Sequence, residues 1–146
     1  MYKAKLVKHV HKDMQLTDEK GKVIFKASVT VSVDDYINNI PQLNRSIREV
    51  TDKTNKLKKT LAGKTKDDML EVMQSISELS QELTSYINTY LVTVFGAAKA
   101  HELLMVCDNR ALDAYCTVVP FVNECVAPEI NKELNNNMAR IVEIMK

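Results

Sequence analysis

The chain has 146 residues, of which 45% are hydrophobic and 27% charged, and its formal net charge is +1. This composition is typical of one folded domain, and so small a net charge gives no general attraction to nucleic acid or to a membrane surface. Aromatic residues make up only 5% and tryptophan is absent, which argues against a surface for stacking bases. No apolar run is long enough to span a membrane, and the charged start, Met1 to Lys5, predicts no signal peptide.

The first elements expected are two strands. The first is predicted from Lys3 to Lys12, with Ala4, Leu6 and Val10 facing inward. A polar turn is predicted from Leu16 to Gly21, in which Asp18 and Gly21 are typical turn residues. The second strand has apolar residues at every second position, which gives one buried and one exposed face: Val23, Phe25, Ala27, Val29, Val31 and Val33. The two strands predict a hairpin, which must pack on helices or on another subunit because an isolated hairpin is marginal in water.

A helix is predicted next, from Asp34 to about Leu61, with Ser32 or Asp34 near its cap and Gly63 as its stop. Pro41 should kink it or divide it into two pieces. Its apolar residues recur every three or four positions and form one stripe: Tyr36, Ile40, Leu43, Ile47, Val50, Thr54, Leu57 and Leu61.

The second helix is predicted from Asp67 to Phe95, with a capping box at Thr65–Asp68 and a stop at Gly96. Between Lys53 and Lys66 there are six lysines and no acidic residue, and between Asp67 and Val92 there are five acidic residues and no basic one. The two helices should therefore attract each other if they pack antiparallel.

Three further helices are expected in the rest of the chain. A short one covers Ala97 to Val106, and Asp108 or Asn109 should cap the next, which starts at Arg110 and is kinked at Pro120. Pro128 should begin the last helix. The predicted fold is α+β and mostly α: an N-terminal antiparallel β-hairpin (1–33) packed on a bundle of about five helices (34–146), in a single domain (1–146).

No residue pattern predicts catalysis, a cofactor or a metal site. Ala62-Gly63-Lys64-Thr65 lacks the earlier glycine of a phosphate-binding loop, because position 58 is a lysine. His9 and His11 share one strand face, but only His101 remains as a third ligand.

The three cysteines, which are nine residues apart, are expected to be reduced, buried hydrophobic residues in a cytoplasm: Cys107, Cys116 and Cys125. We expect no enzymatic activity.

The lysine run is expected to be a solvated helix end. It also allows a second interpretation, a basic helical module that contacts nucleic acid phosphates: Lys53, Lys56, Lys58, Lys59, Lys64 and Lys66. Against that interpretation, the run has no arginine for reading bases and no aromatic residue for stacking on them.

The order of the elements, together with Val94-Phe95-Gly96 before the short helix Ala97–Leu104, resembles the tail assembly chaperones of long-tailed bacteriophages and prophages. The likeness covers roughly residues 20–130 by element order, and Val94-Phe95-Gly96 by motif. It implies a non-enzymatic protein of the host bacterial cytoplasm that binds the tape-measure and tail tube proteins during tail assembly and forms a homo-oligomer.

A strand added at the edge of the hairpin, or an amphipathic helix in a groove containing Met69, Met73 and Met105, would suit such partners. The residues expected near the contact surface are Val29, Val31, Ile40, Leu43, Phe95 and Leu104. A small phage or mobile-element protein that binds and inhibits a host protein is the remaining alternative.

Overall fold

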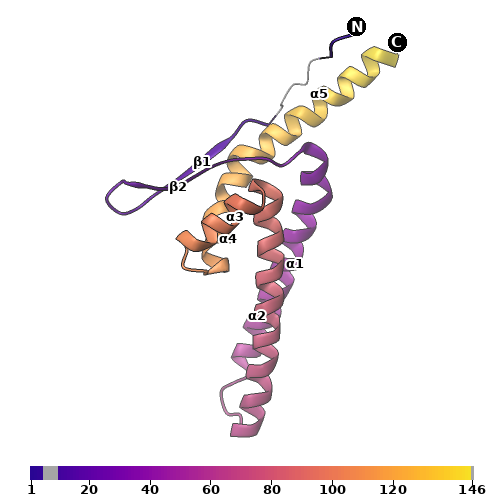
Figure 1. Ribbon diagram of the computed structural model, residues 1–146. Coiled ribbons are helices and arrows are strands. Elements are labelled where there is room, and N and C mark those ends of the chain that lie inside the picture. The colour runs from indigo at the N-terminus through magenta and orange to yellow at the C-terminus, as the bar shows by residue number, and fades with distance from the viewer. Residues whose placement is uncertain (5–9, 146) are drawn as a thin grey trace.

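The structure is a computed structural model that describes residues 1–4 and 10–145 (Figure 1). The chain is 73% helical, with a two-stranded N-terminal hairpin followed by helices, so the predicted mostly α, α+β class is confirmed. The elements in chain order are β1 (Asp13–Thr17), β2 (Val23–Ser28), α1 (Val33–Lys59), α2 (Lys66–Phe95), α3 (Ala97–Val106), α4 (Ala111–Phe121), the π-helical segment η1 (Val122–Val126) and α5 (Ala127–Met145). None of the helices in the described part of the chain is long and apolar enough to cross a membrane.

Strand β1 lies later in the chain than predicted. It pairs antiparallel with β2, from Asp13 opposite Ser28 to Thr17 opposite Val23. The predicted strand Lys3–Lys12 is therefore wrong at residues 3, 4 and 10–12; residues 5–9, including Leu6 and His9, lie outside the described residues, and Ala4 is exposed. The sequence feature that marks β1 is a short alternation of polar and apolar residues, in which Met14 is buried between the exposed Asp13 and Gln15.

Strand β2 is shorter than the apolar alternation suggested. Alternate burial continues to Val31, but pairing with β1 ends at Ser28. The Thr30 N–H instead donates to the Val94 carbonyl oxygen at 2.9 Å, so the extended chain after β2 is attached to the end of α2. Val33, predicted in the strand, is the first residue of α1.

Helix α1 runs without interruption through Pro41, so of the two outcomes expected there, a kink or a division, the division into two helices is wrong. Proline removes the N–H that would bond to the Ile37 carbonyl. Ile37 and Pro41 are both exposed, so water can satisfy that carbonyl. The predicted cap is confirmed, since the Ser32 hydroxyl accepts from the Asp35 N–H at 3.1 Å.

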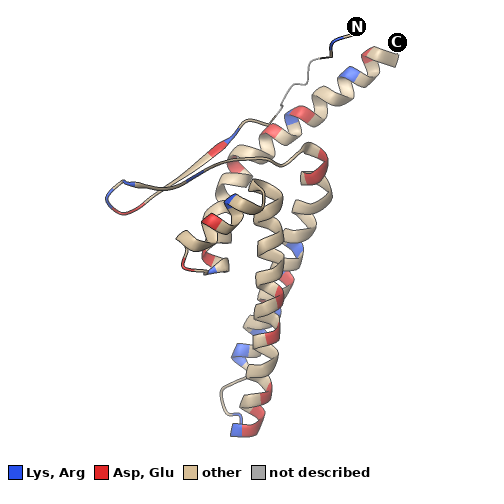
Figure 2. Cartoon of the chain, in the orientation of Figure 1, with Lys and Arg blue, Asp and Glu red and all other residues tan. Residues whose placement is uncertain are grey.

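Helices α1 and α2 form a long antiparallel pair whose far end points away from the rest of the chain (Figure 1). The Thr65 hydroxyl caps α2 by accepting from the Asp68 N–H at 3.3 Å, as predicted. Lysines cluster at that far end and acidic residues lie along α2 (Figure 2). Within the described part of the chain no ion pair joins the two helices, so any attraction between them acts at a distance.

Helices α4 and α5 are joined by η1 into one continuous helical run, so Pro128 does not begin a separate helix as predicted. Pro120 and Pro128 bracket η1, and a π-helical turn is a common way for a helix to accommodate a disrupted hydrogen-bond ladder. The predicted caps of α4 are also wrong. Asp108 and Asn109 have φ of 54° and 59° in a left-handed turn, and Arg110 occupies the N-cap.

The hydrophobic core lies where β2, the C-terminal half of α2, α3, α4 and η1 meet, with α1 contributing Ile40 and Ile47, and we call this region the central junction. Phe95 links its parts: its ring meets Phe25 of β2 edge to face at 6.2 Å and stacks on Phe121 of α4 at 6.2 Å. The turn of the hairpin, the far end of the α1–α2 pair and the end of α5 project from the central junction (Figure 1).

Candidate protein-binding groove

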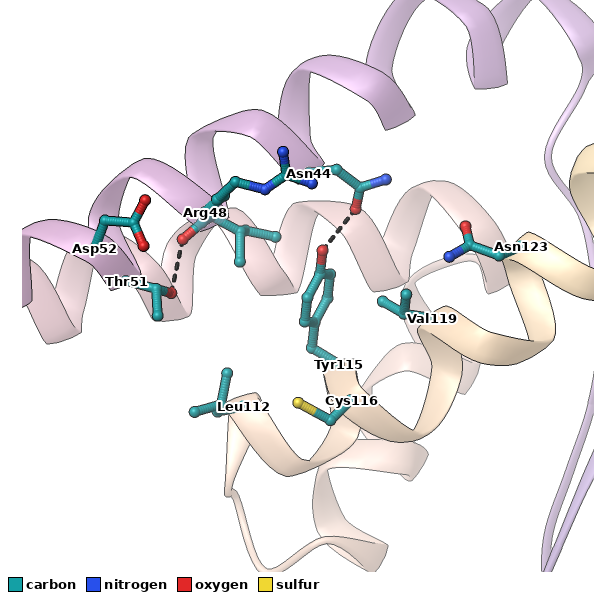
Figure 3. A pocket seen from close by; sticks show the side chains of 10 residues that line it. Asn44, Arg48, Thr51, Asp52, Leu112, Tyr115, Cys116, Val119 and Asn123 are labelled. Carbon is teal, nitrogen blue, oxygen red and sulfur yellow. Dashed lines mark hydrogen bonds between the residues drawn. The ribbon is translucent and has the colours of Figure 1, made fainter. Parts of the chain in front are cut away.

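A groove of about 490 Å³ lies between α1 and α4 (Figure 3). One wall is formed by α1, and the other by α4 and the start of η1. The lining mixes apolar side chains with uncharged polar ones and one opposite-charged pair of residues: Asn44, Ile47, Arg48, Thr51, Asp52, Leu112, Tyr115, Cys116, Val119 and Asn123.

Tyr115 holds the two walls together. Its hydroxyl donates to the Asn44 side-chain oxygen at 2.6 Å, across from α4 to α1. Its ring meets the ring of Tyr90 on α2 edge to face, with 5.1 Å between centroids. Because Tyr90 is fully buried, Tyr115 rests on the core while its hydroxyl bonds across the groove to α1.

Burial raises the pKa of the Tyr115 hydroxyl above its usual value, and the neighbouring Cys116 adds to the rise while Arg48 opposes it. The phenol is therefore protonated at neutral pH and serves as a neutral hydrogen-bond donor. Burial also raises the pKa of Tyr90. A groove that places a neutral hydroxyl beside apolar side chains suits a partner surface that is itself partly polar and partly apolar.

A second groove of about 430 Å³ adjoins the first and shares Leu112 with it. It is bounded by α1, by α2 and by the turn between α3 and α4, through residues that include Ile76, Leu83 and Ala111. Leu112 is 46% exposed and stands between the two grooves. Together the two grooves form a longer surface than either alone, and an elongated surface of this kind can bind an extended or helical segment of a partner.

The residues predicted near a partner lie mainly in the core. Val29, Val31, Ile40 and Phe95 are buried, and Leu43 and Leu104 are half-buried against the same cluster. The four buried residues therefore offer almost no surface to a partner, because the hairpin and the helices cover them. The methionines predicted to share a groove do not do so: Met69 and Met73 lie at the start of α2, whereas Met105 is on α3, after its other end.

The Val94-Phe95-Gly96 step has a structural role at the end of α2. Gly96 has φ of 85° and ψ of 164°, a conformation that residues with a side chain rarely adopt. It ends α2 where the Val94 carbonyl receives the Thr30 N–H and where Phe95 packs between Phe25 and Phe121.

The six lysines of the alternative interpretation are all exposed at the far end of the α1–α2 pair (Figure 2): Lys53, Lys56, Lys58, Lys59, Lys64 and Lys66. The acidic residues Asp52, Asp67, Asp68 and Glu71 belong to the same end of the helices. Mixed charges of this kind favour the prediction of a solvated helix end.

His11 and His101 are both exposed, and His9 lies outside the described residues. No group of three potential metal ligands occurs in the described part of the chain. All three cysteines are free, but the prediction that they are buried is wrong for Cys116, which is exposed, while Cys107 and Cys125 are half-buried. Cys116 follows Tyr115 on α4 and faces the groove (Figure 3) rather than the core.

The sequence did not identify the groove. No sequence pattern singled out Leu112, Tyr115 or Asn44 as residues of a binding site. The available signal was a tyrosine, whose ring can be buried while its hydroxyl reaches a polar partner. Comparisons with known proteins add nothing here: no family model, no curated protein and no solved structure matches the chain.

Proposed function

We propose that this protein is a non-enzymatic assembly factor that binds a helical segment of a partner protein in the groove between α1 and α4. The observation that carries the proposal is the pair of adjoining grooves that share Leu112. Leu112 and Val119 supply apolar contacts, while Asn44, Thr51 and Asn123 add uncharged polar groups to the lining. A binding site for an amphipathic helix needs both kinds of contact.

The resemblance by element order makes the partner more specific. In that form of the proposal the protein is a phage or prophage tail assembly chaperone that acts in the bacterial cytoplasm. Its partners are the tape-measure protein, which is long and helical, and the tail tube protein. Binding keeps apolar helical segments from aggregating until the tail is built, which requires burial of surface and no chemistry.

The test is co-expression with a helical fragment of the tape-measure protein encoded in the same genome. We expect the chain to keep the fragment in the soluble fraction and to co-purify with it. Leu112→Glu, which places a charge between the two grooves, should abolish the complex without unfolding the chain, because Leu112 is already 46% exposed.

Thr117→Glu is the matched control, since Thr117 is exposed on the same helix and lines neither groove. It should leave the complex intact. A fragment that stays insoluble with the unaltered chain, or a complex that tolerates Leu112→Glu, would contradict the proposal. In that case, capture of a host protein would become the hypothesis to pursue.

A further inference from the structure

The end of α5 carries an apolar stripe that the rest of the described chain leaves uncovered. The main packing partners of α5 are η1 and α1, near its start, where Ile130 is 1% exposed. Beyond that point the helix projects away from the central junction (Figure 1). Exposure along the stripe rises from 39% at Leu134 to 80% at Met145, and the stripe consists of Leu134, Met138, Ile141, Val142 and Met145.

The stripe has the spacing of a coiled-coil seam. Leu134, Met138, Ile141 and Met145 follow one another at intervals of four, three and four residues. At 100° per residue, these four side chains fall within about 60° of the helix circumference, and Val142 widens the stripe to about 100°. The charged residues of this helix lie on the opposite side of that circumference: Glu129, Lys132, Glu133, Arg140 and Glu143.

We propose that the α5 ends of two copies of this chain pair antiparallel along this stripe to form a two-fold symmetric dimer. With the symmetry axis between Ala139 and Arg140, Leu134 of one copy meets Met145 of the other, and Met138 meets Ile141. This pairs the two kinds of seam position with each other, as an antiparallel coiled coil requires. One helix thereby provides both halves of a complementary surface.

The absence of charge along the stripe favours a second copy as the occupant. Coiled-coil helices that select a different partner use charged residues beside the seam. The positions beside this seam are occupied by Asn135, Asn137, Val142 and Ile144. Two copies can therefore approach without placing like charges together, and Val142 and Ile144 widen the apolar contact.

The area is also appropriate. Covering the exposed parts of the stripe on both copies buries on the order of 1,000 Å², the lower end of the range for a specific interface. A helical end of this length is marginal in water unless its apolar face is packed, so pairing would also stabilise the end of α5 itself. The inference does not depend on the proposed groove function, which concerns α1 and α4.

Light scattering and sedimentation of the full chain alone, across a concentration series, test the inference. We expect a concentration-dependent dimer. Met138→Glu should weaken dimerisation by about tenfold or more, because it places an unpaired charge in the seam. Asn136→Glu, an exposed position of the same helix turned away from the stripe, is the matched control and should leave the dimer unchanged.

The helix orientation is tested by disulfide formation in a background where Cys107, Cys116 and Cys125 are replaced by serine. An antiparallel pair should cross-link Leu134→Cys only to Met145→Cys, because two copies of either variant place their thiols about 16 Å apart along the axis. Cross-linking of each variant to itself would overturn the antiparallel arrangement.

A monomer at every concentration, or a dimer indifferent to Met138→Glu, would overturn the pairing of α5. Circular dichroism melting of each variant confirms that loss of the dimer is not loss of the fold. Since no partner protein is present, failure here leaves the groove proposal standing, and failure of the tape-measure experiment leaves the dimer standing.

Discussion

The central junction and the projecting ends of the helices are built from the same sequence pattern but differ in what covers it. On α2, Ile87, Leu91 and Val94 form an apolar stripe that is 0% exposed. On α5, a stripe of the same periodicity is 52% exposed at Ile141 and 80% at Met145. Helical periodicity therefore defines an apolar face, while the path of the rest of the chain determines whether that face is core or contact surface.

The largest expected difference is in the free energy of unfolding that is lost when a leucine of α2 is shortened to alanine in one region or the other. Leu91→Ala removes a fully buried side chain at the central junction and should lower the free energy of unfolding by about 2–5 kcal/mol. Leu70→Ala, the same change at the 58% exposed far end of α2, should cost at most about 0.5 kcal/mol. Urea unfolding followed by circular dichroism measures both losses. Equal losses would contradict the conclusion that the central junction is core and the far end of α2 is not.

A smaller difference is expected between two glycines. Gly96 lies at the central junction with φ of 85° and ψ of 164°, and Gly63 lies in the α1–α2 turn with φ of 78°. Gly96→Ala should destabilise the chain by about 1–3 kcal/mol because its backbone region is nearly exclusive to glycine.

Gly63→Ala should cost about 1 kcal/mol, since its added Cβ meets open space. Thermal unfolding of the two variants should rank them in that order. The reverse order would show that the end of α2 adjusts more easily than the α1–α2 turn.

The smallest effects are expected at two tyrosines whose rings are in contact, Tyr90 on α2 and Tyr115 on α4. Tyr115→Phe removes the hydroxyl that bonds to Asn44 and should cost about 1 kcal/mol. Tyr90→Phe should be neutral or slightly stabilising, because the buried Tyr90 hydroxyl has no hydrogen-bond partner among the described residues. Urea unfolding of both variants tests this. A loss of unfolding free energy in Tyr90→Phe as large as that in Tyr115→Phe would contradict the conclusion that the Tyr115–Asn44 hydrogen bond stabilises the groove.

Local pattern determined the class of this fold and most of its helices. The stripe of α1, the caps at Ser32 and Thr65 and the stop at Gly96 were all readable, because each depends on residues within a few positions of one another. Burial of alternate residues from Phe25 to Val31 was readable for the same reason.

Where the prediction failed, the deciding contacts join residues far apart in the sequence. β1 lies at Asp13–Thr17 because β2 pairs there, and β2 ends at Ser28 because Thr30 bonds to Val94. The exposure of Cys116 likewise depends on which face of α4 packs on α2, since Cys116 lies opposite the buried Ala114 and Val118.

The candidate site belongs wholly to the tertiary structure. Asn44 and Tyr115 are 71 positions apart, and no local rule relates them. The sequence determined which faces of the helices are apolar, since periodicity is a property of the chain alone. Only the packed structure decided which faces are core, which line the grooves and which, at the end of α5, remain exposed, since burial depends on what the rest of the chain can reach.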